Sequence, residues 1–157
     1  MSKEKAIQRT LHVNNSALKA FEVFTENMSD WWPRDYTWCR EVLEEIGMEN
    51  EEGGLCYEIG PHNFRLDWGR VIEYDPPARL RFTWQISPLR LPEPDPAKAS
   101  EIEINFIEED ELRTRLEFSH KKFENHGKGG DKYREIMDSP EGWDYILICY
   151  SEFLSSK

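Results

Sequence analysis

The chain has 157 residues, with 20 Lys and Arg against 31 Asp and Glu, which gives a formal net charge of −11. This length is typical of one domain with one core, so we expect a single domain over residues 1–157. The negative charge argues against nucleic acid as a partner, and without an apolar run of 18 residues or a secretory signal we expect no membrane insertion and a cytoplasmic location.

The first elements are a strand and a helix. Residues 6–13 alternate between apolar and polar side chains, which predicts a strand whose apolar face is interrupted by Arg9. Residues 16–25 carry apolar side chains at the spacing of an amphipathic helix, and Asn14 or Asn15 precedes them as a candidate cap.

A tryptophan-rich segment follows. We expect a short second helix there, ended by Pro33, because the residue before a proline disfavours helical angles. For Trp31, Trp32 and Trp38 we favour packing in the core, and the alternative is a lid or a partner surface. The next segment, residues 41–52, fits neither a helix nor a strand pattern.

Alternating segments then predict a series of antiparallel strands. They begin at residues 55, 64, 80, 102 and 114, with a bulge at Gly69 in the second. The strand that starts at Leu80 places Phe82, Trp84 and Ile86 on the same face. Four prolines make residues 87–100 a loop.

The C-terminal part is predicted to be a polar loop with one helical turn at 132–137, followed by a long apolar helix. Ser139, Pro140 and Glu141 are typical first residues of a helix. We therefore expect an α+β fold: a curved antiparallel sheet of about six strands grips this helix, and two short helices follow the first strand.

Several short motifs occur in a recognisable order. They are Trp31-Trp32, Gly53-Gly54, Gly69-Arg70-Val71, Asp75-Pro76-Pro77 with the strand after it, residues 114–120 and Gly142-Trp143. With the pattern of the first helix, they resemble homologues of the activator of the heat-shock-protein-90 ATPase, a family of the START-like or SRPBCC helix-grip superfamily. This resemblance implies a deep cavity between the sheet and the last helix, used in the superfamily for lipids, sterols, polyketides and flavonoid-like molecules.

Candidate ligand-binding residues lie on the predicted inner face. His120 and Tyr57 could orient a polar group of a ligand, and His120 could also act as a general base. The remaining candidates are apolar or aromatic and would form the pocket wall: Trp68, Phe82, Trp84, Phe106, Leu116, Trp143 and Tyr150. Plain core packing is the alternative for each of them.

No Ser/His/Asp or Cys/His arrangement can be identified from spacing, so we assign no catalytic residue, and we expect no metal site and no cofactor. By alternation, Glu58 and Asp67 should point away from the aromatic face as solvated charges. The glycines at 127–130 lack the spacing of a phosphate-binding loop. We expect Cys39, Cys56 and Cys149 to be buried, reduced thiols.

Three functions remain open from the sequence. We favour binding of a small hydrophobic molecule, lipid-, flavonoid- or polyketide-like, by a monomer or homodimer. The alternatives are an interaction module for a chaperone or another protein, and a polyketide cyclase or hydrolase that uses the same cavity.

Overall fold

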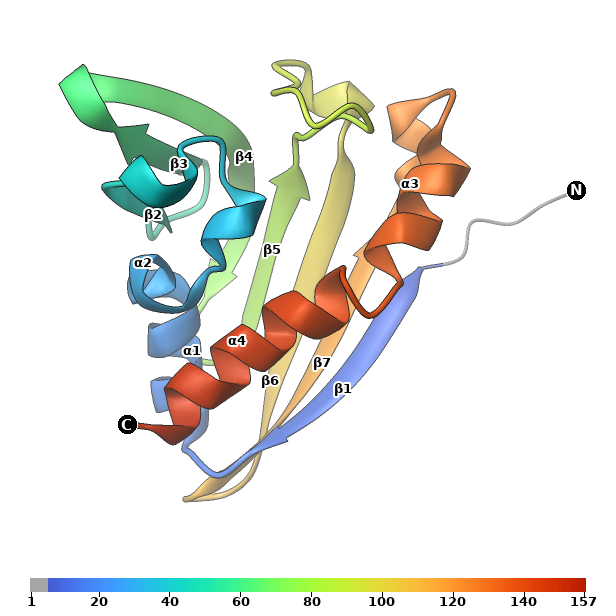
Figure 1. Ribbon diagram of the computed structural model, residues 1–157. Helices are drawn as coiled ribbons and strands as arrows, with labels where there is room; N and C mark the ends of the chain where they lie inside the picture. Colours follow the sequence, from blue (N-terminus) through green and yellow to red (C-terminus); the bar gives the residue numbers. More distant parts are fainter. Residues whose placement is uncertain (1–5) are drawn as a thin grey trace, which may run out of the picture.

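The computed structural model describes residues 6–157, which form one curved antiparallel sheet with helices on its inner side (Figure 1). The strand order is β1-β7-β6-β5-β4-β3-β2. The strands are β1 (Ile7–Val13), β2 (Glu45–Met48), β3 (Leu55–Gly60), β4 (Phe64–Asp75), β5 (Arg79–Trp84), β6 (Ser100–Asp110) and β7 (Arg113–Lys121). The α-helices are α1 (Ala17–Glu26), α2 (Met28–Trp31), α3 (Gly130–Met137) and α4 (Trp143–Ser155).

The long helix α4 runs diagonally across the inner face of the sheet, and α1 and α2 lie beside its C-terminal half (Figure 1). The α+β helix-grip fold is therefore confirmed, with seven strands in the described part instead of about six. The additional strand is β2, inside the segment that fitted neither pattern. Its residues Ile46, Gly47 and Met48 are all buried, so the strand has no polar face that could reveal the period of two.

The beginnings of two helices differ from the prediction. At α1 the side-chain oxygen of Ser16 accepts a hydrogen bond from the backbone N–H of Lys19 at 3.1 Å, so Ser16 is the cap, and Asn14 and Asn15 are not. α2 ends at Trp31, ahead of Pro33 as predicted.

Helix α4 begins at Trp143, later than its predicted start at Pro140 with Ser139 as cap. Residues 139–142 form a turn in which the N–H of Gly142 donates to the carbonyl oxygen of Ser139 at 2.9 Å. A Cβ on Gly142 would lie 2.2 Å from the carbonyl oxygen of Met137, so only glycine allows α3 and α4 to approach this closely.

Arg9, the charged residue on the inner face of β1, forms ion pairs with residues of the C-terminal part. Its guanidinium donates to a carboxylate oxygen of Asp144 at 2.6 Å and to one of Asp138 at 2.8 Å. The side chain thus ties β1 to the first turn of α4 and to the residue just after α3. Burial is the largest single effect and lowers the pKa of Arg9. The hydrogen bonds and negative charges of Asp144 and Asp138 together outweigh it, so the pKa is raised above its ordinary value.

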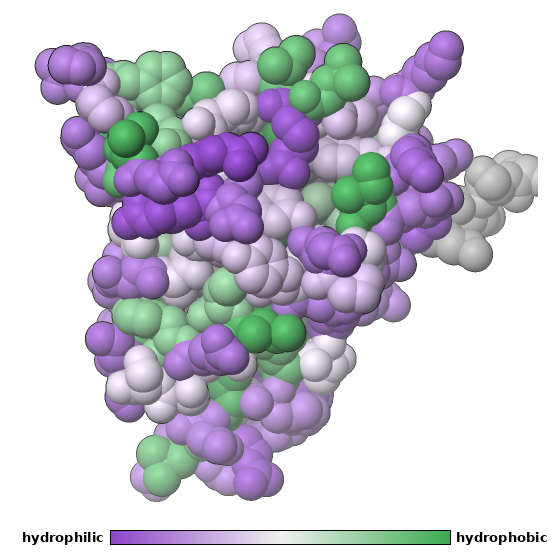
Figure 2. Space-filling model, in the orientation of Figure 1, coloured by the Kyte–Doolittle hydropathy of each residue, from purple (hydrophilic) through white to green (hydrophobic). Residues whose placement is uncertain are grey.

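The central strands follow their predicted faces. In β5, Leu80, Phe82 and Trp84 are buried, and Ile86 beyond its end is buried as well. Cys56 pairs with Gly69 while Tyr57 pairs with Asp67, so Trp68 is the extra residue of a bulge, next to its predicted place. On the face shown in Figure 2, hydrophobic residues lie singly or in small groups among hydrophilic ones, because most aromatic side chains are buried.

Candidate functional site

Four tryptophans meet between the sheet and α4. Trp68 comes from β4, Trp84 from β5, Trp143 from the start of α4, and Trp32 from the residue after α2. Trp32 lies over Trp68 with ring centroids 5.8 Å apart and an interplanar angle of 28°, a stacked arrangement. Trp84 contacts both Trp68 and Trp143 at tilted or edge-on angles, at 5.8 and 5.4 Å. We call Trp32, Trp68, Trp84 and Trp143 the tryptophan cluster.

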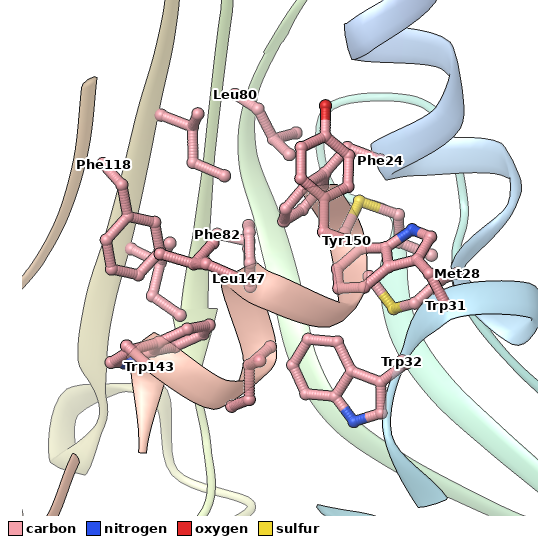
Figure 3. Close-up of a cluster of buried hydrophobic side chains, with 14 of the residues drawn as sticks. Phe24, Met28, Trp31, Trp32, Leu80, Phe82, Phe118, Trp143, Leu147 and Tyr150 are labelled. Atoms are coloured by element: carbon pink, nitrogen blue, oxygen red, sulfur yellow. The ribbon is translucent and has the colours of Figure 1, made fainter. Parts of the chain in front are cut away.

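Eight of the nine predicted ligand-binding side chains are buried: Trp68, Phe82, Trp84, Phe106, Leu116, His120, Trp143 and Tyr150. Phe106 packs against Phe21 and Phe24 of α1 and pairs with Leu116, so these two are not brought to the tryptophan cluster. Figure 3 shows Phe82, Trp143 and Tyr150 together with Trp31 and Trp32 between α4 and the strands. In this conformation the rings contact one another, so the predicted pocket wall forms a packed core. Their role in binding a ligand stays a prediction.

The prediction was wrong for the orientation of Tyr57. Residues paired directly across two antiparallel strands point to the same face, and Tyr57 pairs with Asp67, the exposed neighbour of buried Trp68. Tyr57 therefore lies on the outer face, where its ring is covered by the guanidinium of Arg65 and its hydroxyl donates to Glu45. It takes no part in the site.

Glu58 is the corresponding error. It was expected in solvent, but it is 0% exposed. Since Tyr57 points to the outer face, its neighbour Glu58 points to the inner face. Its carboxylate accepts hydrogen bonds from the backbone N–H groups of Trp38 and Cys39 at 2.9 to 3.2 Å. This buried acceptor fixes the segment after α2 against the sheet. Burial, with Glu58 nearby, raises the pKa of the Cys39 thiol to about 11.

The cysteines were expected to be buried, and only Cys56 is. Cys39 and Cys149 are partly exposed, and all three are free thiols. Burial raises the pKa of the Cys56 thiol strongly, so it behaves as a small apolar side chain.

A chain of hydrogen bonds connects the tryptophan cluster to the protein surface. Trp143 Nε1 lies 2.9 Å from His120 Nδ1, His120 Nε2 lies 2.7 Å from Ser100 Oγ, and Ser100 Oγ lies 2.7 Å from His126 Nε2. Burial lowers the pKa of His120 well below 6.5 and that of His126 to about 4, so both imidazoles are neutral at neutral pH.

The donor and acceptor of each hydrogen bond in this series follow from the indole of Trp143. An indole N–H can only donate, so His120 Nδ1 is the acceptor and His120 Nε2 carries the ring proton. That proton is donated to Ser100, whose hydroxyl hydrogen is then donated to His126 Nε2. Both nitrogens of His120 are therefore occupied, and its lone pair is not free to act as a general base in this arrangement.

One indole differs from the others. Five of the six tryptophans donate their N–H: Trp31 to Val23, Trp32 to Tyr36 and Trp38 to Arg90, all carbonyl oxygens, Trp84 to the Tyr133 hydroxyl and Trp143 to His120. Trp68 Nε1 has no hydrogen-bond partner among the described residues, although the side chain is only 1% exposed. An unpaired buried donor costs about 1–3 kcal/mol and calls for an explanation.

Three segments meet at the surface outside Trp32: the residues after α2, the loop between β5 and β6, and the turn before α4. The Tyr36 hydroxyl donates to the carbonyl oxygen of Glu141 at 2.6 Å, and Trp38 Nε1 donates to that of Arg90 at 2.9 Å. Two surface pockets of about 320 and 540 Å³ share Asp35, Tyr36 and Arg90 in their walls. We call this region the entrance.

Sequence reasoning missed several residues of the site. Ser100 is the last residue of one predicted loop, and His126 lies inside the predicted polar loop before the last helix. Tyr133 lies in the predicted helical turn at 132–137, and none of the three carries a spacing signal that points to the site. Their positions depend on contacts across the chain. Trp31 and Trp32 are buried as expected, whereas Trp38 is partly exposed at the entrance.

The described residues contain no group of three side chains placed to hold a metal ion. Over residues 6–157, no helix is long and apolar enough to cross a membrane.

Comparisons place this geometry among known proteins. Residues 15–147 match the family described as Activator of Hsp90 ATPase homolog 1-like protein. No curated protein matches the chain significantly. Among solved structures, the anthrahydroquino-gamma-pyrone synthase Txn09 is 32% identical with a TM-score of 0.67, and the match covers 97% of this chain and 99% of that one.

Two more distant structures share the fold. The self-sacrificing resistance protein CalC from Micromonospora echinospora is 23% identical with a TM-score of 0.66, over 96% of this chain and 94% of CalC. Norcoclaurine synthase from Thalictrum flavum, solved with dopamine and hydroxybenzaldehyde, is 13% identical with a TM-score of 0.57, over 98% and 88%. At these identities the likeness concerns the fold alone.

Proposed function

The chain belongs to the family of activator of Hsp90 ATPase homolog 1-like proteins, with the helix-grip fold, and from this premise we propose that it binds a small, flat, hydrophobic molecule between the sheet and α4. The molecule would lie on Trp68, in the position that the Trp32 indole occupies in this conformation.

The observation that carries this proposal is the stacking of Trp32 on Trp68. Aromatic pairs favour such offset stacking at centroid separations of about 4.5–7 Å, so a flat aromatic ligand can pack on Trp68 as Trp32 does. Trp84 and Trp143 supply the other walls, and buried aromatic walls with few polar groups are typical of small-molecule sites.

Trp32 is attached to the part of the chain that could move away. Its indole N–H bonds to Tyr36 in its own segment, so this bond survives when the segment moves. Besides ring packing, the segment is tied to the rest of the fold by directional hydrogen bonds, among them those from Tyr36 to Glu141, from Trp38 to Arg90 and from the backbone to Glu58. Opening at the entrance would therefore carry Trp32 off Trp68.

The Txn09 relative supports a flat ligand. It is 32% identical over nearly the full length of both chains, and its name describes a fused-ring product. The proposal for this chain extends only to binding a molecule of this general shape.

Indole ¹⁵N NMR of the purified protein tests the proposal. Flat polycyclic compounds added one at a time should shift the N–H signals of Trp32, Trp68, Trp84 and Trp143, whereas an aliphatic compound such as decanoate should not. If no flat compound moves any of these four signals, the proposal is wrong.

A matched pair of variants locates the site. Trp32→Ala removes the side chain that competes with the ligand, so flat compounds should bind more tightly than to the parent protein. Trp31→Ala empties a similar buried volume next to Tyr150 but not on Trp68, and should leave their affinity unchanged. Equal tightening in both variants would indicate binding in an artificial cavity and contradict the proposal.

A second candidate function is catalysis on a polyketide-like molecule, because the 32% identical relative is named as a synthase. His120 is the one histidine inside the core, and it could accept a proton only after its bond with Trp143 is broken. Conversion of an aromatic polyketide ketone that is lost in His120→Gln and kept in Cys149→Ser would support catalysis. Conversion that survives His120→Gln would remove its only candidate base.

A further inference from the structure

Two buried hydrogen-bond donors next to Trp84 have no acceptor. The first is Trp68 Nε1–H, whose ring centroid is 5.8 Å from that of Trp84. The second is the Tyr133 hydroxyl. Its oxygen accepts from Trp84 Nε1 at 2.7 Å, so its hydrogen is left to donate, and none of residues 6–157 accepts it.

Both groups remain donors at every ordinary pH. An indole has no acceptor nitrogen, and burial raises the pKa of Tyr133 to about 12, so the phenol keeps its proton. Trp68 is 1% and Tyr133 2% exposed, which leaves bulk water little access to either group. A buried donor without an acceptor costs stability, and a ligand that supplies the acceptor would remove this cost.

The acceptors in the same part of the core are already in use. His120 Nδ1 accepts from Trp143, the Ser100 oxygen accepts from His120, and the Tyr133 oxygen accepts from Trp84. Each of these acceptors already receives one hydrogen bond, whereas neither donor has an acceptor, so a ligand that brings a bare oxygen satisfies the groups left unpaired.

We propose that Trp68 and Tyr133 recognise carbonyl oxygen, so that the ligand is a flat aromatic ketone, quinone or pyrone and not a plain hydrocarbon. This inference rests on the proposed function and specifies the chemistry of its ligand. A hydrogen bond to a carbonyl contributes about 0.5–1.5 kcal/mol, so two of them should favour the ketone over its hydrocarbon frame by roughly tenfold.

Two probes with the same three-ring frame test the inference: 9-fluorenone, which has a carbonyl, and fluorene, which has a CH₂ in its place. Dissociation constants come from titration of tryptophan fluorescence, and hydrogen bonding at Trp68 from the shift of its indole N–H signal. We expect fluorenone to bind about tenfold more tightly and to move the Trp68 proton downfield relative to fluorene.

Tyr133→Phe keeps the ring and removes the hydroxyl donor, but it also leaves Trp84 Nε1–H without its acceptor. The preference for fluorenone should fall about threefold, and the indole N–H signal of Trp84 in this variant should not move downfield with fluorenone relative to fluorene, which shows that Trp84 does not replace the lost donor. Tyr150→Phe is the matched control. It also deletes a buried hydroxyl, but one that donates to the carbonyl oxygen of Ala20, and it should leave the preference unchanged.

The possible failures are distinct. If neither probe binds, and no flat compound does, the proposed function fails and this inference fails with it. If both probes bind with equal affinity, or if the preference is the same in Tyr133→Phe and the parent protein, binding stands and recognition of a carbonyl is refuted.

Discussion

Mild acid should destabilise the fold through the two histidines bonded to Ser100. Burial lowers the pKa of His126 from 6.5 to about 4, and it lowers the pKa of His120 well below 6.5. In the unfolded chain both rings return to an ordinary pKa near 6.5. Below this pH the unfolded state binds protons that the folded state excludes, so stability is complete above pH 6.5 and is lost as the pH falls towards the folded values.

The size of the effect follows from these shifts. A fall of the pKa of His126 from 6.5 to about 4 would correspond to about 3 kcal/mol at full effect. His126 is only partly buried, and water screens its charge, so we expect about half of this, 1–2 kcal/mol. His120 is fully buried and adds a loss in the same direction.

Urea unfolding at a series of pH values measures the effect. Between about pH 7 and pH 5.5 the free energy of unfolding should fall by about 1.5–2 kcal/mol, before most carboxylates titrate. His126→Gln should remove a third to a half of this loss.

A free energy of unfolding that stays constant over this range would refute the reasoning. Two imidazoles whose pKa values are lower in the folded than in the unfolded state must make the stability depend on pH. An equal loss in His126→Gln and the parent protein would refute the part assigned to His126.

Three further predictions concern residues that hold the site in place. Glu58→Gln weakens a charged acceptor of two backbone N–H groups and should lower the free energy of unfolding by about 1.5–3 kcal/mol in urea, whereas Asp67→Asn on the outer face should change it by less than about 0.5. Ser16→Ala should cost about 1 kcal/mol by the same assay because the cap of α1 is lost, and an equal effect of Asn15→Ala would contradict this assignment. Arg9→Gln should lower the melting temperature by several degrees, less so at high salt, and a loss that does not depend on salt would argue against ion pairing as its cause.

Much of the fold could be predicted from local patterns. The faces of β5 follow from strict alternation, and α1 follows from its apolar spacing, because each element buries one side against a single core. The same reasoning could not recognise β2, since a strand buried on both sides has no alternation. It also placed the start of α4 at Pro140, after Ser139 as cap. The close approach of α3 and α4 instead requires a turn there, which ends at Gly142.

The candidate site divides in the same way. The buried positions of Trp68, Trp84 and Trp143 were predicted because large aromatic side chains on an apolar face have nowhere else to pack. Tyr57 and Glu58 were assigned to each other's faces. Only the pairing of β3 with β4 decides which of two alternating sets points inward.

The sequence by itself determined the class of fold, the family resemblance and the aromatic character of the interior, because these depend on the order and spacing of residues within single elements. The tertiary structure alone decided which polar groups meet there. Trp68 without an acceptor, Tyr133 beside Trp84, and His120 with both nitrogens engaged depend on contacts between residues from 20 to 49 positions apart in the chain. No local pattern records such contacts, and they give the proposed site its chemistry.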